Sequence, residues 1–247
     1  MDIRLDSVSK TFEDGEEPLA ALAPTTLRIA SGEFVSFIGP SGCGKSTLLR
    51  LIADQVPPTT GRIQLQGESP RAARMRKQIA WMAQSPALLP WKRAIDNVEL
   101  PQSVNRRHQQ AAPKPAALLA MVQLTDFATA YPSTLSGGMQ QRVALARALA
   151  TGAALWLMDE PFAALDELTR ETLTQEVLML WQQFSPTVLW VTHNIIEAAR
   201  MADRVFVMTS SPGQIRETVR IELPRPRDET TPEMGAIIRR LRKLLRE

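Results

Sequence analysis

The residues with the clearest chemistry form a glycine-rich segment that carries one lysine and several hydroxyl side chains. It matches the pattern G-x-x-x-x-G-K-[ST] and lies between an expected strand and an expected helix, the setting such a loop needs. The glycines let consecutive backbone N–H groups turn toward phosphate oxygens, and the helix start adds a positive dipole end. Lys45 would give its charge to the outer phosphates, and Ser46 would hold Mg²⁺. The segment consists of Gly39, Pro40, Ser41, Gly42, Cys43, Gly44, Lys45, Ser46 and Thr47. The alternative interpretation is a plain glycine turn without a ligand.

Two carboxylates and a histidine follow apolar, strand-like runs further along the chain. Asp159 and Glu160 directly follow the run 155–158, and His193 directly follows the run 188–192. Asp159 would hold the Mg²⁺ shell, and Glu160 would polarise a water for attack on a γ-phosphate. The imidazole of His193 could hydrogen-bond a γ-phosphate oxygen or that water. Solvated acids and a structural histidine are the alternatives that these residues leave open.

A second anion site is expected at residues 135–142. Ser136 would cap a helix, and Gly137 and Gly138 would leave its first N–H groups uncovered. An ordinary capped helix with a flexible entry is the alternative. A chain with two such cradles either binds two nucleotides or shares each nucleotide with another copy.

These segments and Gln84 come in the order of the ATP-binding cassette (ABC) ATPases, and the Leu-Ser-Gly-Gly-x-Gln-x-Arg pattern is nearly diagnostic of them. The chain resembles this family over residues 1–220. The resemblance implies a P-loop NTPase fold with a mostly parallel central sheet, an antiparallel β subdomain and a helical insertion. It also implies ATP and Mg²⁺ as cofactors and ATP hydrolysis as the activity.

The resemblance also assigns roles to individual residues. Phe12 matches the aromatic that stacks on adenine, and Asp166 matches the residue that communicates across a dimer. Ser136, Gly137 and Gly138 match the signature that clamps ATP held by the opposite subunit. Gln84 matches the glutamine that senses Mg²⁺ and links to a membrane partner. The implied catalytic set is Glu160, His193 and Gln84, and the implied metal set is Ser46, Gln84 and Asp159.

Two residues depart from the family pattern. Phe12 stands where tyrosine is commoner, which should matter little because stacking needs only a ring. Asn194 follows the histidine where aspartate is frequent. No reason for that asparagine is evident from the sequence.

The segment 84–98 resembles the importer branch for nitrate, sulfonates and taurine through its Leu-Leu-Pro-Trp and Asp-Asn-Val elements. Riboflavin and thiamine-precursor importers share these elements, so they do not identify the solute. The branch implies a second ATPase copy, transmembrane permease subunits and an extracytoplasmic solute-binding protein. Two other functions remain possible: a cassette for DNA repair or translation, and a degenerate nucleotide-binding module. Intact Lys45, Asp159, Glu160 and His193 oppose the second.

Strands and helices alternate along most of the chain, which predicts a mostly parallel sheet covered by helices. Residues 1–224 are expected to form the ATPase domain, with a helical subdomain inserted at about 85–150, and 225–247 a basic tail. Expected strands cover 3–8, 26–29, 33–38, 63–65, 79–82, 155–158, 187–191, 204–208 and 215–221. Expected helices cover 47–54, 94–100, 116–122, 136–149, 166–184 and 195–201.

Composition fits a soluble globular protein, with 44% apolar and 22% charged residues among 247. The formal net charge of +3 belongs to residues 225–247, because residues 1–224 hold 22 charges of each sign. This balance argues against nucleic acid as a partner. No stretch is apolar enough to cross a membrane and no signal peptide is evident, so a peripheral place on the cytoplasmic face of the cell membrane is expected.

The tail opens with Pro-Arg-Pro-Arg, read as a linker, and closes with an amphipathic helix. Docking of this helix on its own domain is the favoured interpretation, and contact with anionic lipid is the alternative. Trp81 is expected in the core and Trp91 at the surface of a coupling segment. The single cysteine, Cys43, is expected to lie against the nucleotide, where it would serve as a thiol probe.

Overall fold

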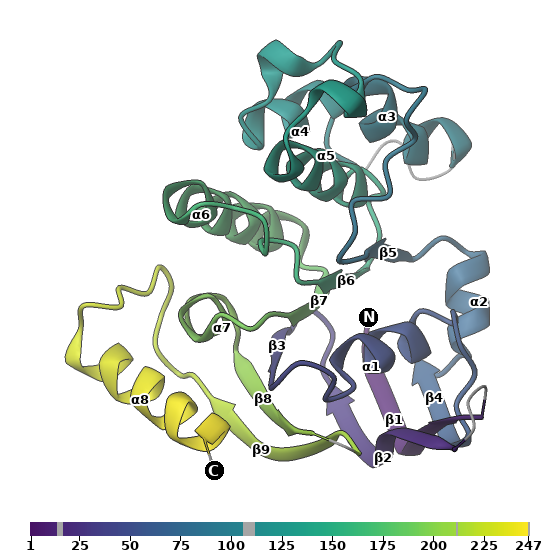
Figure 1. Ribbon diagram of the computed structural model, residues 1–247, viewed down its shortest axis with the longest axis vertical. Coiled ribbons are helices and arrows are strands. Elements are labelled where there is room, and N and C mark those ends of the chain that lie inside the picture. Colours follow the sequence, from purple (N-terminus) through teal and green to yellow (C-terminus); the bar gives the residue numbers. More distant parts are fainter. Residues whose placement is uncertain (14–16, 106–111, 211, 247) are drawn as a thin grey trace. The chain divides into compact units, whose positions relative to one another are not determined.

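The computed structural model describes residues 1–13, 17–105, 112–210 and 212–246. It divides into two compact units, Met1–Arg76 with Pro186–Glu247, and Lys77–Ser185 (Figure 1). The predicted helical insertion at 85–150 lies within the second unit and remains a prediction as a domain boundary.

The first unit contains a three-stranded antiparallel sheet in the order β2-β1-β4. Its strands alternate between buried apolar and exposed polar residues, as in Ile3, Arg4 and Leu5, because one face packs on the core while the other meets water. The strands are β1 (Ile3–Phe12), β2 (Leu19–Ile29) and β4 (Thr60–Leu65). All three were expected, but each begins earlier or runs further than the local sequence pattern suggested.

A second sheet in this unit places β7, β3 and β8 side by side in parallel, with β9 antiparallel at the edge. Every residue of β3 and β7 is buried, which fits strands covered on both faces. Phe37 of β3 stacks on Phe206 of β8 with ring centroids 4.9 Å apart. The elements are β3 (Phe34–Ile38), α1 (Lys45–Ile52), α2 (Pro70–Met75), β7 (Thr187–Val191), α7 (Ile195–Met201), β8 (Arg204–Thr209), β9 (Gln214–Arg220) and α8 (Pro232–Arg246).

The second unit combines two parallel strands with a group of helices. β5 pairs with β6 from Ile79↔Leu155 to Met82↔Met158. Helices α3, α4 and α5 gather together in this unit (Figure 1). The elements are β5 (Ile79–Met82), α3 (Ala94–Val104), α4 (Pro115–Met121), the 3₁₀ turns Thr125–Phe127 and Pro132–Thr134, α5 (Gly137–Leu149), β6 (Leu155–Asp159) and α6 (Glu167–Phe184).

Several predicted elements are confirmed to the residue, namely β5, β7 and α7. Others differ for identifiable reasons. Helix α1 begins at Lys45 rather than 47, because Gly44 with φ 86° serves as its cap. Helix α3 continues through Pro101 to Val104, and the short helix α2 was not predicted. The expectation that Trp81 lies in the core is wrong, since its side chain is half-buried.

The interpretation of Pro-Arg-Pro-Arg as a linker is also wrong. Arg227 is 9% exposed and donates hydrogen bonds to five backbone carbonyls, those of Ala199, Arg200, Ala202, Ile221 and Leu223. Arg225 donates to the carbonyl of Met201 and to Asp203. Both arginines therefore fasten the segment to the end of α7.

The favoured interpretation of the final helix is confirmed. Helix α8 packs beside α7 and β8 through Met234, Ile238 and Leu241, which are buried (Figure 1). Its remaining positions carry most of the arginines of the tail. Within the described residues, no helix is both long and apolar enough to span a membrane.

Candidate functional site

The glycine-rich loop joins β3 to α1 and has the backbone that its sequence predicted. Gly42 and Gly44 have φ of 78° and 86°, values that side chains strongly disfavour. A Cβ on Gly42 would meet nothing within 4 Å, so the outer side of the loop is open. Pro40, Ser41 and Gly42 are exposed, whereas Ser46 and Thr47 in the first turn of α1 are half-buried. This open, glycine-lined cradle at a helix start suits a phosphate chain.

Lys45 supports the loop from within. Its side chain is 6% exposed, and its Nζ donates to the carbonyl oxygens of Gly39 at 2.8 Å and Pro40 at 2.9 Å. A buried ammonium needs such acceptors, because desolvation without a partner is costly. The charge is thus held at the base of the loop, where it can serve bound phosphates.

The thiol of Cys43 does not occupy the position that we expected. Its side chain is fully buried, and its Sγ lies 3.6 Å from Lys45 Nζ. A Cβ on Gly39 would come within 2.7 Å of this sulfur, so Gly39 is the residue that makes room for it. The expectation of a convenient thiol probe is therefore wrong, and only the backbone of Cys43 is available to a ligand.

The predicted adenine-stacking residue lies at the end of β1. Phe12 is half-buried, and Lys10 Nζ lies 4.9 Å from the centroid of its ring. Phe12 pairs with Leu19 at the start of β2. One face of the ring thus already engages a cation.

His193 follows β7, whose last residue pairs with Phe37 of β3. Because the two strands are parallel, their carboxyl ends meet, and the His193 segment lies at the same sheet end as the phosphate loop. The His193 side chain is exposed. Asn194 caps α7, since its Oδ1 accepts hydrogen bonds from the N–H groups of Ile196 and Glu197. Helix capping therefore explains the asparagine, because asparagine and aspartate serve this role about equally well.

In the second unit, β5 and β6 bring Gln84 and Glu160 together. The two strands run parallel, so the residues that follow them meet at one edge. Gln84 Nε2 donates to Glu160 Oε2 at 3.4 Å. Asp159, the last residue of β6, is 3% exposed. Glu160 has φ of 49°, a conformation that costs free energy in a residue with a side chain and that clusters at functional sites.

Gln141 is a supporting residue that the sequence analysis did not single out. It is buried on α5, and its Nε2 donates to the backbone oxygen of Glu160 at 3.5 Å. It directly follows Gln140, which is the Gln of the Leu-Ser-Gly-Gly-x-Gln-x-Arg pattern, so Gln141 stands at a variable position of that pattern. The pattern therefore carried no signal for Gln141, because its contact with Glu160 joins α5 to the residue after β6 and is not local in the sequence.

The second predicted cradle has the expected helix cap. Ser136 Oγ accepts a hydrogen bond from Met139 N at 3.3 Å, and both Ser136 and Gly137 are exposed. A Cβ on Gly137 would meet nothing within 4 Å, whereas one on Gly138 would lie 3.0 Å from the carbonyl oxygen of Ala164. The N-terminus of α5 is therefore open to an anion on the Gly137 side.

Asp166 is the N-cap of α6. Its carboxylate accepts hydrogen bonds from the backbone N–H of Thr169 at 2.9 Å and from the hydroxyl of Thr169 at 2.7 Å. These bonds, the backbone bond foremost, lower the pKa of the Asp166 carboxyl below its usual value. Asp166 is thus ionised at neutral pH and its cap is formed.

The predicted residues fall into two groups, one in each unit. The first unit carries Phe12, the loop Gly39 to Thr47 and His193, and the second carries Gln84, Ser136, Gly137, Gly138, Asp159, Glu160 and Asp166.

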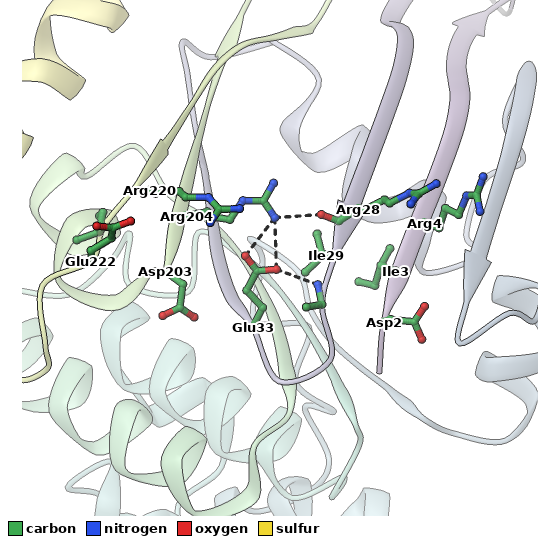
Figure 2. Close-up of a pocket in the computed structure, with 12 residues that line it drawn as sticks. Asp2, Ile3, Arg4, Arg28, Ile29, Glu33, Asp203, Arg204, Arg220 and Glu222 are labelled. Carbon is green, nitrogen blue, oxygen red and sulfur yellow. Dashed lines mark hydrogen bonds and ion pairs between the residues drawn. The ribbon is translucent and has the colours of Figure 1, made fainter.

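The larger of the two cavities described in the first unit does not include the phosphate loop. It measures about 660 Å³ and lies at the amino end of β3, away from the loop that follows its carboxyl end. Four arginines and four acidic residues line it (Figure 2). Arg204 donates to Glu33 at 3.1 Å and to the carbonyl of Arg28, while Asp203 pairs with Arg225. Because the positive and negative charges that line this cavity balance, the cavity does not favour binding of a triphosphate.

The chain as a whole is similar to known proteins of one family. The family model described as ABC transporter matches residues 22–163. An uncharacterized ABC transporter ATP-binding protein of Methanocaldococcus jannaschii is 40% identical over 99% of this chain and 91% of its own length. The nitrate import ATP-binding protein NrtD of Synechococcus elongatus is 40% identical over 92% of this chain and 83% of its own. The aliphatic sulfonates import ATP-binding protein SsuB 1 of Pseudomonas fluorescens is 46% identical over 92% and 81%.

A solved structure gives the same answer for the fold. A dimeric ATP-binding cassette in a post-hydrolysis state, bound to ADP and phosphate, superposes with a TM-score of 0.80 at 34% identity. The match covers 90% of this chain and 100% of that one. The predicted fold class is confirmed.

A phosphate loop between a buried strand and a helix, in an α/β fold with an antiparallel sheet and a helical group, defines a nucleotide-binding protein of the P-loop NTPase class. Within that class, the chain belongs to the ABC transporter family, and it is an ATP-binding and ATP-hydrolysing subunit. The resemblance to the nitrate and sulfonate importer branch is likewise confirmed.

Proposed function

We propose that this ATPase energises an importer for a small solute of the nitrate, sulfonate, taurine or vitamin-precursor type. The relatives named for nitrate and aliphatic sulfonate import support this class. The observation that carries the proposal is the loop that presents Trp91. This side chain is 71% exposed, although tryptophan is highly buried on average.

The loop around Trp91 is held by one buried amide. Asn97 is fully buried, accepts a hydrogen bond from Leu89 N at 2.8 Å, and donates to the carbonyl oxygens of Leu89, Lys92 and Arg93. A satisfied buried amide fixes the surrounding backbone. The exposed indole is thus displayed on a stiff loop, as expected for a docking surface for a permease subunit.

We assign the nucleotide roles as follows. Lys45 and the loop backbone hold the phosphates, and Phe12 stacks on adenine. Glu160 is the general base, and His193 contacts the γ-phosphate or the attacking water. Mg²⁺ would take Ser46, Gln84 and Asp159 and neutralise charge that develops on the phosphates, because this ion is commonly held by one or two carboxylates together with substrate phosphates.

Two copies are proposed to share each nucleotide. Ser136, Gly137 and Gly138 of one copy would close on ATP held by the loop of the other, at the open N-terminus of α5. ATP would close the dimer and hydrolysis would reopen it. An extracytoplasmic binding protein would deliver the solute, and the cassette would sit peripherally on the cytoplasmic face of the membrane.

A growth experiment tests the solute class. The gene is deleted in the source organism, which is then grown with nitrate as the sole nitrogen source or with taurine or an alkanesulfonate as the sole sulfur source. We expect the deletion strain not to grow on one of these sources. The wild-type gene should restore this growth, and the Lys45→Ala variant should not. Lys114→Ala, which changes an exposed lysine of the second unit, is the matched control and should rescue.

The outcome also separates the rival functions. Normal growth of the deletion strain on all of these sources, together with sensitivity to DNA damage or a defect in translation, would replace the importer by a non-transport cassette. Rescue by Lys45→Ala would indicate a module that needs no ATP.

A further inference from the structure

Gly213, the residue before β9, lies directly against the phosphate loop. A Cβ placed on Gly213 would stand 2.1 Å from the carbonyl oxygen of Cys43 and 3.0 Å from its carbonyl carbon. No side chain can occupy such a space, because heavy atoms do not approach this closely. The oxygen is the nearer of the two atoms, so the Cys43 carbonyl points toward Gly213.

Three backbone segments meet at this contact, which we call the junction: the phosphate loop at Cys43, the chain at Gly213, and strand β2 at Ala21. Gly213 N donates to Ala21 O at 3.2 Å, and Ala23 N donates to Gly213 O at 2.9 Å. A Cβ on Gly44 would lie 2.6 Å from the same Ala21 oxygen. Three backbone segments therefore meet where neither Gly44 nor Gly213 has room for a side chain.

The junction also connects the loop with the strand that carries Phe12. Strand β2 pairs with β1 from Ile29 back to Leu19, which lies opposite Phe12. A displacement of β2 at Ala21 would thus move both the phosphate loop and the aromatic residue proposed to stack on adenine.

We propose that Gly213 is a positioning residue for nucleotide binding, which fixes the Cys43–Gly44 peptide and ties the phosphate loop to the Phe12 hairpin. In a planar trans peptide the C=O and N–H groups point in opposite directions. Holding the Cys43 carbonyl against Gly213 therefore turns the Gly44 N–H away from the turn, to the side from which a phosphate approaches. This inference rests on the proposed role of the loop in holding ATP phosphates.

Gly213→Ala is the direct test. The φ of Gly213 is not in the left-handed region, so alanine is compatible with the backbone and only the steric conflict operates. The methyl group must push the Cys43 carbonyl away. We expect a rise in the KM for ATP of roughly tenfold to a hundredfold, because the loss of a hydrogen bond to a charged group such as a phosphate weakens binding by about that factor. The kcat should change much less.

The single cysteine supplies a readout that does not depend on activity. Cys43 is fully buried in the native loop, so a thiol reagent reacts with it only when the loop moves. We expect Gly213→Ala to react at least several-fold faster than the wild type under native conditions. Affinity for a fluorescent ATP analogue, measured without turnover, should fall in parallel.

Two control variants separate positioning from general destabilisation. Gly235→Ala in α8 adds a methyl group whose nearest neighbour is the flexible end of Arg239, and it should change neither KM nor thiol reactivity. Val219→Ala removes buried atoms from β9, and it should lower Tm without raising the KM for ATP. Equal thiol reactivity in Val219→Ala and Gly213→Ala at matched Tm would overturn the inference.

If Gly213→Ala does not fold, Pro212→Gly loosens the turn without adding atoms near Cys43. It should raise thiol reactivity and KM in the same direction but less. Unchanged values in this variant, or in a folded Gly213→Ala, would refute the positioning role. If instead the wild type fails to bind the ATP analogue, the role of the loop in holding ATP fails, while the thiol measurement still reports whether Gly213 holds Cys43.

Discussion

Glu160 combines three features that distinguish it from a merely solvated acid. Its backbone has positive φ, its carboxylate accepts from Gln84, and its backbone oxygen accepts from the buried Gln141. Such a conformation persists only where neighbouring contacts determine it. These contacts fix the direction of the carboxylate, which a general base requires.

Glu160→Gln should separate binding from hydrolysis. The substitution keeps the shape of the side chain and removes the base, so the ATPase rate should fall about 10²–10⁴-fold. It also removes a negative charge near the triphosphate, which favours closure. The variant should therefore accumulate as an ATP-bound dimer in size-exclusion chromatography, while the wild type with ADP elutes as a monomer.

Glu167→Gln is the matched control for this variant, because Glu167 is an exposed acid in the same unit. It should hydrolyse ATP like the wild type. A wild-type rate for Glu160→Gln would mean that another group activates the water.

At the scale of elements, α7 is fixed at both ends. Asn194 caps its N-terminus directly after His193, and Trp190 of β7 donates to the buried carboxylate of Glu197. Arg225 and Arg227 satisfy carbonyl groups at its C-terminal end. Burial lowers the pKa of the Arg227 guanidinium to about 10, so this residue remains charged at neutral pH and its donors stay engaged. The tail thus stabilises the helix that follows the proposed switch histidine.

Arg227→Leu should destabilise the protein by about 2–4 kcal/mol, because several buried carbonyls would lose a charged donor. Urea unfolding followed by circular dichroism measures this loss. Arg242→Leu, in an exposed position on α8, is the control and should change stability by less than about 0.5 kcal/mol. Equal stability of the two variants would show that the arginine contacts with α7 contribute little.

At the scale of the whole molecule, the proposal divides each nucleotide site between two copies. A site made in this way can be rebuilt from two different inactive chains, because each supplies the half that the other lacks. This property distinguishes a shared site from two independent sites.

Lys45→Ala and Ser136→Arg should each abolish ATP hydrolysis when measured alone. In an equimolar mixture, mixed dimers contain one site with an intact loop and an intact signature. We expect the mixture to hydrolyse ATP well above the sum of the separate variants, and the gain should depend on protein concentration. Activity no greater than that sum would argue that both cradles serve one chain.

The sequence by itself determined the features that depend on nearby residues. The phosphate loop, the cap at Ser136, and the strands β5 and β7 follow from glycines, a hydroxyl and apolar runs within a few positions of one another. The order of these motifs was also sufficient to indicate the family. Local backbone preference and helix capping act over one or two turns, so they can be read along the chain.

Only the tertiary structure decided what depends on distant segments. Cys43 is buried rather than accessible because Gly39 and Lys45 enclose it, and Trp81 is half-exposed because β5 lies at the edge of its sheet. Arg227 is an anchor because α7 ends with carbonyls that need donors. Gly213 lies 170 positions after Cys43 yet leaves no room beside it. Such contacts form when the chain packs, and no local pattern encodes them.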